Sequence, residues 1–214
     1  MSCCQCQGLE QLFDRKTAQE ELSSYQKNGP EKSTGILIDA LKAEGVAALS
    51  LLDIGGGIGA IQHELLKAGA GHAINVDAST AYIEAAQQEA ERLGQADRTQ
   101  FHHGNFVDLA PHIEPVDIVT LDRVICCYPD LPALVGLSAS RARKFYGLVF
   151  PRDTWWLKIG CAVINFGAWL IRQPYRFFIH PSPAVEAILA QHELERCFYR
   201  KTFFWQIAVY KSKI

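Results

Sequence analysis

The chain has 214 residues, of which 49% are hydrophobic and 21% are charged, and its formal net charge is -2 at pH 7. That length supports one substantial hydrophobic core and is short for two, and the composition is that of a folded globular protein rather than a disordered one. Because the chain is close to neutral, it has no general attraction to polyanions, so no nucleic-acid partner is predicted.

Two helices are predicted before the first buried strand. Apolar residues recur at helical intervals between residues 9 and 26, which predicts an exposed helix. The stretch NGPEKSTG interrupts that pattern, and ILIDALKAEG predicts a second helix. Residues 1–46 are therefore interpreted as an N-terminal helical cap on a main domain at 47–214. We expect the part around Tyr25 and the GPEKSTG turn to close over the site described below.

Strands and helices then alternate regularly up to residue 151. Short apolar stretches predict strands, and the longer periodic segments between them predict helices. The predicted strands are AALSLLDI, HAINVD, RTQFHHG, VDIVTLD and RKFYGLVFP, and the predicted helices cover 58–68, 79–93 and 130–140. This alternation is typical of right-handed βαβ units, so we expect a doubly wound α/β fold with a mainly parallel sheet.

The stretch at 155–171 is apolar and helical in pattern. It is shorter than the roughly 20 apolar residues that cross a bilayer, and Lys158 and Asn165 interrupt it. One interpretation is a helix buried against the sheet. The other makes 152–183 a helical lid insertion that forms an apolar acceptor pocket, with peripheral membrane contact through 155–178.

The C-terminal part predicts a helix at 184–192 followed by two aromatic strands, LERCFYRKT and FFWQIAVYK. Almost no residues separate these strands, so they must form a hairpin and run antiparallel. With the five earlier strands, the chain is expected to build a seven-stranded, mainly parallel sheet that ends in an antiparallel hairpin.

A glycine-rich loop, LLDIGGGIGA, joins the first predicted strand to its helix. Small residues there let backbone N–H groups approach a ligand, and the helix N-terminus favours negative charge. The loop fits G-x-G-x-G through Gly55, Gly57 and Gly59. It also fits the dinucleotide form G-x-G-x-x-A through Gly55, Gly57 and Ala60. The loop therefore predicts a nucleotide-like ligand without saying which one.

Two carboxylates and the chain's last strands separate these readings. Asp53 precedes the loop, where its charge would repel a pyrophosphate and attract an ammonium or sulfonium group. Asp77 ends the next strand, where a carboxylate can accept hydrogen bonds from both ribose hydroxyls in either reading. An aromatic hairpin stands where a dinucleotide enzyme would continue with a second parallel half. Together these features favour a cationic nucleoside.

Four motifs in this order make the chain similar to the class I S-adenosylmethionine-dependent methyltransferases. LLDIGGGIG resembles their first motif, NVDAS the acidic second motif, GNFVDL the loop after the third strand, and VDIVTLDRVICCYPD the fourth strand and its continuation. The resemblance covers Ala48 to about Pro151 and, by topology, the final hairpin. It implies a Rossmann-like methyltransferase fold, an enzyme, and S-adenosyl-L-methionine as the cofactor.

The resemblance also implies roles for individual residues. The residues that it places at the cofactor are Asp53, Gly55, Gly57, Gly59, Asp77, Ala78, Asn105, Phe106 and Asp122. The three glycines would pass beside the methionine part, whose ammonium group Asp53 would approach. Asp77 would bind the ribose hydroxyls, and Ala78 would lie against the adenine. Many members have an Asp that accepts from the adenine amine where this chain has Asn105, whose amide oxygen can accept the same bond.

The segment DRVICCYPD after the fourth strand is expected to surround the transferred methyl group. It lacks the N/D-P-P-Y/F tetrapeptide of many enzymes that methylate nucleic-acid or protein nitrogens, which favours a small-molecule acceptor with an oxygen or nitrogen nucleophile. The apolar pocket that a lid at 152–183 would form suits a lipophilic acceptor. The layout is similar to that of magnesium-protoporphyrin O-methyltransferases, whose equivalent turn reads His-Tyr-Pro, and Cys127 stands at the His position here. Candidates for a general base are Tyr128, His180 and His192.

The cysteines indicate a reducing compartment. The chain has seven of them, an odd number, and it shows no secretion-like start, so we expect reduced thiols and a cytoplasmic location. Cys3 and Cys6 form a C-x-x-C without a second pair of matching spacing, so no metal site is predicted.

Two other functions fit the same loop and strand-end carboxylates. One is an NAD(P)-dependent oxidoreductase, because the glycine loop and Asp77 also satisfy the dinucleotide pattern. The other is a noncatalytic module that binds a nucleoside.

Overall fold

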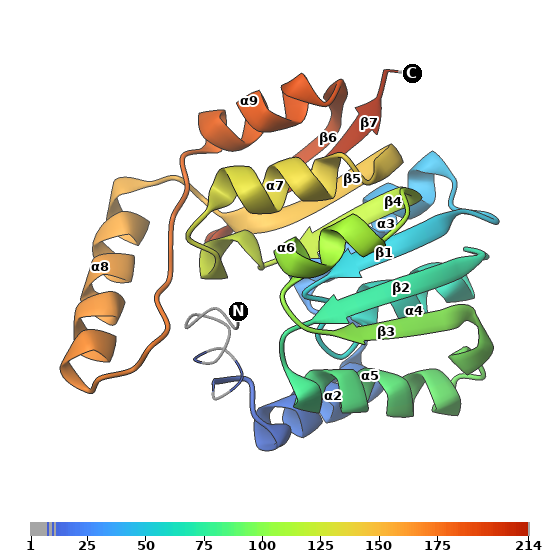
Figure 1. Cartoon of the computed structure of the whole chain (residues 1–214), viewed down its shortest axis with the longest axis horizontal. Coiled ribbons are helices and arrows are strands. Elements are labelled where there is room, and N and C mark those ends of the chain that lie inside the picture. The colour runs from blue at the N-terminus through green and yellow to red at the C-terminus, as the bar shows by residue number, and fades with distance from the viewer. Residues whose placement is uncertain (1–7, 9, 11, 214) are drawn as a thin grey trace.

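The computed structural model describes residues 8, 10 and 12–213, so the predicted C-x-x-C of Cys3 and Cys6 lies outside the described residues. One seven-stranded sheet has the order β3-β2-β1-β4-β5-β7-β6 (Figure 1). The strands are β1 (Ser50–Ile54), β2 (His72–Asp77), β3 (Thr99–His103), β4 (Val116–Asp122), β5 (Ala142–Pro151), β6 (Leu194–Lys201) and β7 (Trp205–Ser212). The α-helices are α2 (Arg15–Asn28), α3 (Lys32–Glu44), α4 (Ala60–Lys67), α5 (Thr80–Arg92), α6 (Phe106–Leu109), α7 (Leu131–Ala139), α8 (Trp155–Leu170) and α9 (Ser182–Gln191).

The strand directions confirm the predicted doubly wound fold. β1 to β5 run parallel, and β7 pairs antiparallel with both β5 and β6. β1 and β4 are neighbours in the sheet although two strands separate them in the chain. The connections that leave them therefore run to opposite sides, which opens a crevice at their carboxyl ends.

Side-chain caps fix where two of the helices begin. The Asp14 side chain accepts a hydrogen bond from Thr17 N at 2.8 Å, so the helical pattern predicted from residue 9 is interrupted and α2 begins at Arg15. Ser79 caps α5 in the same way, because its hydroxyl accepts from Tyr82 N at 3.3 Å.

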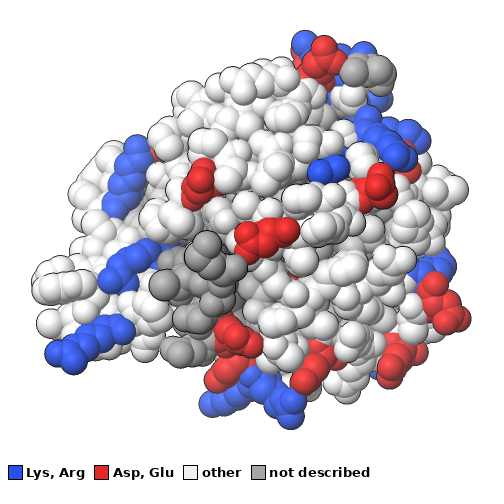
Figure 2. Space-filling view, viewed as in Figure 1, with Lys and Arg blue, Asp and Glu red and all other residues white. Residues whose placement is uncertain are grey.

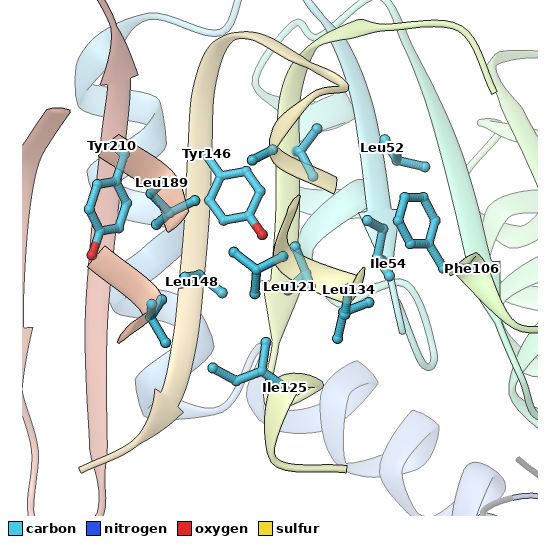
Figure 3. Packing of buried hydrophobic residues seen from close by; sticks show 14 of the residues in the cluster. Leu52, Ile54, Phe106, Leu121, Ile125, Leu134, Tyr146, Leu148, Leu189 and Tyr210 are labelled. Atoms are coloured by element: carbon cyan, nitrogen blue, oxygen red, sulfur yellow. The ribbon is translucent and has the colours of Figure 1, made fainter. Parts of the chain in front are cut away.

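Helices cover both faces of the sheet. α3 and α4 pack on one face against strand residues such as Leu51 and Ile118. α7 and α9 pack on the other face against a cluster that includes Leu52, Leu121 and Tyr146 (Figure 3). Because β1 and β4 are buried on both faces, most of their residues are apolar, and Asp53 and Asp122 lie at or near their carboxyl ends.

α8 does not pack against the sheet, so the interpretation of 155–171 as a helix buried there is wrong. Figure 1 shows α8 standing away from the sheet with the returning chain beside it. Asn165 explains this position, since its side chain donates to Phe177 O at 2.7 Å and accepts from Phe177 N at 2.8 Å. The inner side of α8 is therefore occupied by the returning segment, and only Ala168 of this helix is buried. Within the described residues, no helix is long and apolar enough to cross a membrane.

Candidate active site

A cavity of about 470 Å³ lies at the carboxyl ends of β1, β2 and β4, where the strand order reverses. The glycine loop after β1 and the turns after β2, β3 and β4 form much of its wall. Tyr25 of α2 and Glu31 of the following turn line it as well. Phe177 and Trp205 bring apolar side chains to it from the C-terminal part of the chain.

Two of the cavity-lining glycines combine a left-handed backbone with a close neighbour at the Cβ position. Gly55 has φ +60°, and a Cβ there would lie 2.4 Å from Val124 Cγ2. Gly57 has φ +54°, and a Cβ there would lie 3.3 Å from Tyr82. These conformations are open to glycine and strained for other residues. The bare backbone that results is part of the cavity wall.

Gly59 differs from the other two predicted glycines because it is not among the cavity-lining residues. It precedes α4 with φ +81°, and a Cβ there would lie 2.7 Å from the Gln62 side chain and 2.8 Å from His63. The turn into α4 therefore explains this glycine by itself.

Asp77 ties the glycine loop to the start of α5. Its Oδ2 accepts from Gly57 N at 2.9 Å and its Oδ1 accepts from Ser79 N at 2.8 Å. Burial raises the pKa of this carboxyl, while the two backbone hydrogen bonds act in the opposite direction. Each carboxylate oxygen keeps a further lone pair, so the group can still accept hydrogen bonds from two hydroxyls in the cavity.

Asp53 is buried, with 1% exposure, and its carboxylate is only half satisfied. The register of β1 and β4 places Thr120 opposite Asp53, and the Thr120 hydroxyl donates to Asp53 Oδ1 at 2.7 Å. In the described part of the chain, Asp53 Oδ2 meets no donor with hydrogen-bond geometry. Burial, with smaller contributions from the charges of Asp122 and Asp77, raises the pKa of Asp53 to about 7, although the hydrogen bond from Thr120 acts in the opposite direction. A cationic ligand group would compensate this carboxylate.

Asp122, the last residue of β4, is linked to the N-terminal cap. Thr34 Oγ1 donates to Asp122 Oδ2, and Arg123 Nε donates to Asp122 Oδ1 at 3.2 Å. Arg123 also forms an ion pair with Glu31. Arg123, the one Arg among the described residues of the cavity wall, is thus paired with two carboxylates, so its charge is not free to receive a pyrophosphate.

The predicted adenine-side residues lie together in the cavity wall. Phe106 is buried, and Ala78 and Asn105 line the same cavity. Asn105 Oδ1 accepts from Val107 N at 3.3 Å and so caps α6, while its amide nitrogen donates to Tyr128 Oη at 3.4 Å. An adenine amine would have to share the Asn105 oxygen with this cap.

Of the three candidate bases, only Tyr128 is among the cavity-lining residues, beside Cys126 and Cys127. The His180 ring lies 2.9 Å from Tyr128 O, where it supports the turn from outside. His192 follows α9, and its ring lies 3.9 Å from the Cβ position of Gly136 in α7, so it belongs to the packing of those two helices.

Comparisons with known proteins agree with this geometry. A protein-family model described as a methyltransferase domain matches residues 46–158. A search of the curated proteins gave no match. One similar solved structure is magnesium protoporphyrin IX methyltransferase from Synechocystis PCC 6803 with bound S-adenosylhomocysteine, with a TM-score of 0.68 and 20% identity over 86% of this chain and 82% of that chain. A second is an O-methyltransferase family protein from Burkholderia thailandensis, with a TM-score of 0.68 and 15% identity over 93% of this chain and 60% of that chain. A third is geranyl diphosphate methyltransferase in complex with geranyl diphosphate and sinefungin, with a TM-score of 0.65 and 15% identity over 83% of this chain and 76% of that chain.

At these identities the solved structures establish the fold, which is the predicted Rossmann-like methyltransferase fold. The family match covers more than half of the chain and includes β1 to β5 with the glycine loop and all three strand-end carboxylates. This family match favours a methyltransferase over the two alternatives, an oxidoreductase and a noncatalytic binding module. The chain belongs to the methyltransferase-domain family and is an enzyme that uses S-adenosyl-L-methionine.

Proposed function

We propose that this enzyme methylates an oxygen or nitrogen atom of a small, lipophilic acceptor. The observation that carries the proposal is the mixed lining of the cavity. Carboxylates and bare backbone are its polar part, and side chains that include Leu134, Phe177 and Trp205 are its apolar part. Two of the similar structures carry magnesium protoporphyrin IX and geranyl diphosphate in their names, which supports a lipophilic acceptor here.

The residues of the polar part fit the cofactor. The unsatisfied oxygen of Asp53 would receive its ammonium group, the glycine loop would pass its methionine part, and Asp77 would accept from its ribose hydroxyls. Asn105, Phe106 and Ala78 would surround the adenine. Bound there, the cofactor supplies a methyl group on a sulfonium, a leaving group that needs no protonation.

The residues of the apolar part would orient the acceptor and exclude water. In-line displacement depends mainly on alignment of the nucleophile, and a general base is needed only when the acceptor must lose a proton. Tyr128 is the group proposed to accept this proton, because the residue lines the cavity and its hydroxyl lies 3.4 Å from the amide nitrogen of Asn105, another lining residue.

The proposal includes a small-molecule partner and a cytoplasmic location. The net charge of -2 and the acidic cavity do not suit a nucleic acid, and the odd number of cysteines suits a reducing compartment.

Replacement of Phe177 with Ala is expected to raise KM for a lipophilic acceptor by about tenfold, since it removes a large part of one apolar side chain from the pocket. A panel of phenols and aromatic carboxylates, compared with polar amines in a labelled-methyl assay, would identify the acceptor class first. The affinity for S-adenosylhomocysteine should not change in this variant. Turnover confined to polar amines would contradict the acceptor proposal, and so would an unchanged KM in the Phe177→Ala variant.

Cofactor affinity is expected to increase as the pH rises from 6 to 8. With its pKa raised to about 7, Asp53 is largely neutral at pH 6 and ionised at pH 8, and only the ionised form attracts an ammonium group. The increase should be up to about tenfold. In the ligand-free protein the same raised pKa acts in the other direction, because the folded state holds a proton that the unfolded chain releases, so stability falls between about pH 4 and pH 7.

Calorimetric titration with S-adenosylhomocysteine at the two pH values, in buffers of different ionisation enthalpy, measures both the affinity and the protons released. The Asp53→Asn variant is the control, since its amide stays neutral at both values and the release due to this residue should disappear. A wild-type profile that is flat between pH 6 and pH 8 would remove the assigned role of Asp53.

A further inference from the structure

The exposed apolar side chains of this protein gather in one region instead of being scattered. Among the described residues, the large hydrophobic side chains that are exposed are Trp155, Ile159, Val163, Ile164, Phe166, Trp169, Leu170, Ile171, Tyr199, Phe203 and Phe204. All of them belong to α8, to the residue that follows it, or to the β6–β7 hairpin, and we call this region the α8 surface. Single exposed apolar residues are ordinary on a protein surface, whereas a contiguous patch marks an interaction site.

Aromatic contacts join the two parts of the α8 surface. Trp156 lies 5.1 Å from Phe203 and 5.9 Å from Phe204 between ring centroids, so the hairpin tip packs at the first turn of α8. Farther along the helix, Phe166 and Trp169 stack at 5.8 Å while both remain more than half exposed. The patch therefore extends from the hairpin tip along α8.

The charges along α8 and the returning chain have one sign. Residues 154–185 contain Lys158, Arg172 and Arg176 and neither Asp nor Glu. The nearby Asp153 is mostly buried and is paired with Lys158 at 2.5 Å. Figure 2 shows the same pattern on one face, where the projecting part of the molecule is white and blue with almost no red. Elsewhere on this face, acidic and basic side chains are both present.

An apolar helix with a basic border matches the surface of an anionic bilayer. Aromatic and aliphatic side chains enter the boundary between headgroups and acyl chains, and Lys and Arg extend their charged ends to the lipid phosphates. A second copy of the chain fits less well, because a twofold interface would bring Lys158 and Arg172 against basic residues of the same patch.

The α8 surface is also connected to the cavity. The Asn165 side chain of α8 is hydrogen-bonded to the backbone of Phe177, and Phe177 lines the cavity. Trp205, at the start of β7 in the hairpin, lines the cavity as well. These two aromatic residues therefore belong both to the wall of the cavity and to the segments that carry or contact the α8 surface.

We propose that the α8 surface docks this enzyme on an anionic lipid bilayer. The docking stands on the α8 surface alone, and only the delivery of an acceptor from the bilayer rests on the proposed function. The enzyme is held at the interface by the outward side chains of α8 and the hairpin tip, with the mouth of the cavity facing the lipid.

Flotation of the full chain with vesicles tests the docking without any methyl transfer. Vesicles of phosphatidylcholine with about 30% phosphatidylglycerol should carry the protein upward, and pure phosphatidylcholine vesicles should carry much less of it. The double variant Phe166→Glu/Trp169→Glu should bind the anionic vesicles at least about tenfold more weakly. Arg172→Gln should weaken binding by about fivefold, the effect of one basic residue near the surface.

The matched control is Gln87→Glu/Gln88→Glu, which adds the same two negative charges to exposed positions of α5. This variant should float like the wild type, and all variants should bind S-adenosylhomocysteine equally, which separates the docking from the cofactor site. Equal flotation of the wild type and Phe166→Glu/Trp169→Glu would overturn the proposal. It would also be overturned if the wild type bound neither kind of vesicle and formed a stable dimer, measured by light scattering, that the same double variant dissociates.

Discussion

The Gly55→Ala variant is expected to bind S-adenosylhomocysteine at least about a hundredfold more weakly than the wild type, the loss that a displacement of about 1 Å in an active site can cause. Gly55 has φ +60°, and the added Cβ would lie 2.4 Å from Val124 Cγ2. The left-handed conformation alone costs Ala about 1 kcal/mol, so most of the effect must come from movement of the loop away from Val124. Calorimetric titration measures the affinity, and urea unfolding measures the free energy of unfolding.

Two further variants separate the contact from the backbone strain. In Gly55→Ala/Val124→Ala the contacting Cγ atoms are removed. If side-chain crowding is the cause, this double variant should bind S-adenosylhomocysteine at least about tenfold more tightly than Gly55→Ala. Gly94→Ala is the matched control, because Gly94 has φ +65° and nothing within 4 Å of the Cβ position. It should lose about 1 kcal/mol of stability and no affinity. If Gly55→Ala behaves like Gly94→Ala, the glycine loop is not the cofactor cradle.

The parallel part of the sheet was predictable because short, mostly apolar segments alternate with longer helical ones. HAINVD and VDIVTLD coincide with β2 and β4, and an acidic residue closes each strand. The central strands are buried on both faces, so most of their positions are apolar and the pattern needs no strict alternation to be recognised. Helix starts were less accurate, since the cap at Asp14 depends on a local hydrogen bond that periodicity does not report.

The site was predictable where a motif lies on one continuous segment, and not where it depends on pairing between distant segments. The glycine loop and Asp77 are read from the strand-turn-helix pattern. The Thr120 hydroxyl reaches Asp53 only through the register of β1 with β4, and Thr34 reaches Asp122 only because α3 packs across the sheet. Neither threonine carries a signal of its own in the sequence, so neither was found.

The position of α8 could not be predicted from the periodicity of its sequence. Its sequence is apolar around most of the helix, so the pattern indicates a helix but not which neighbour covers it. The outcome is decided by the Asn165 side chain, which binds the backbone of Phe177 and fills the inner side of α8 with the returning chain. The same hydrogen bonds bring Phe177 to the cavity, which no motif near the glycine loop could indicate.

Replacement of Asp77 with Ala is expected to weaken the binding of S-adenosylhomocysteine by about 1 to 3 kcal/mol, the range for hydrogen bonds to a charged group. The variant loses the acceptors for the ribose hydroxyls, and it also frees the Gly57 and Ser79 N–H groups, so the loop is held less firmly. Calorimetric titration at constant pH measures this change.

Asp117→Ala is the matched control for Asp77→Ala. Asp117 also accepts two hydrogen bonds through a strand carboxylate, from Ser50 N at 3.0 Å and Ser50 Oγ at 2.9 Å, but it lies near the amino end of β4, away from the cavity. Both variants should lose stability in urea unfolding, and only Asp77→Ala should lose affinity. Because the control removes comparable hydrogen bonds at the opposite edge of the sheet, equal affinities in the two variants would show that Asp77 supports the fold without holding the ribose.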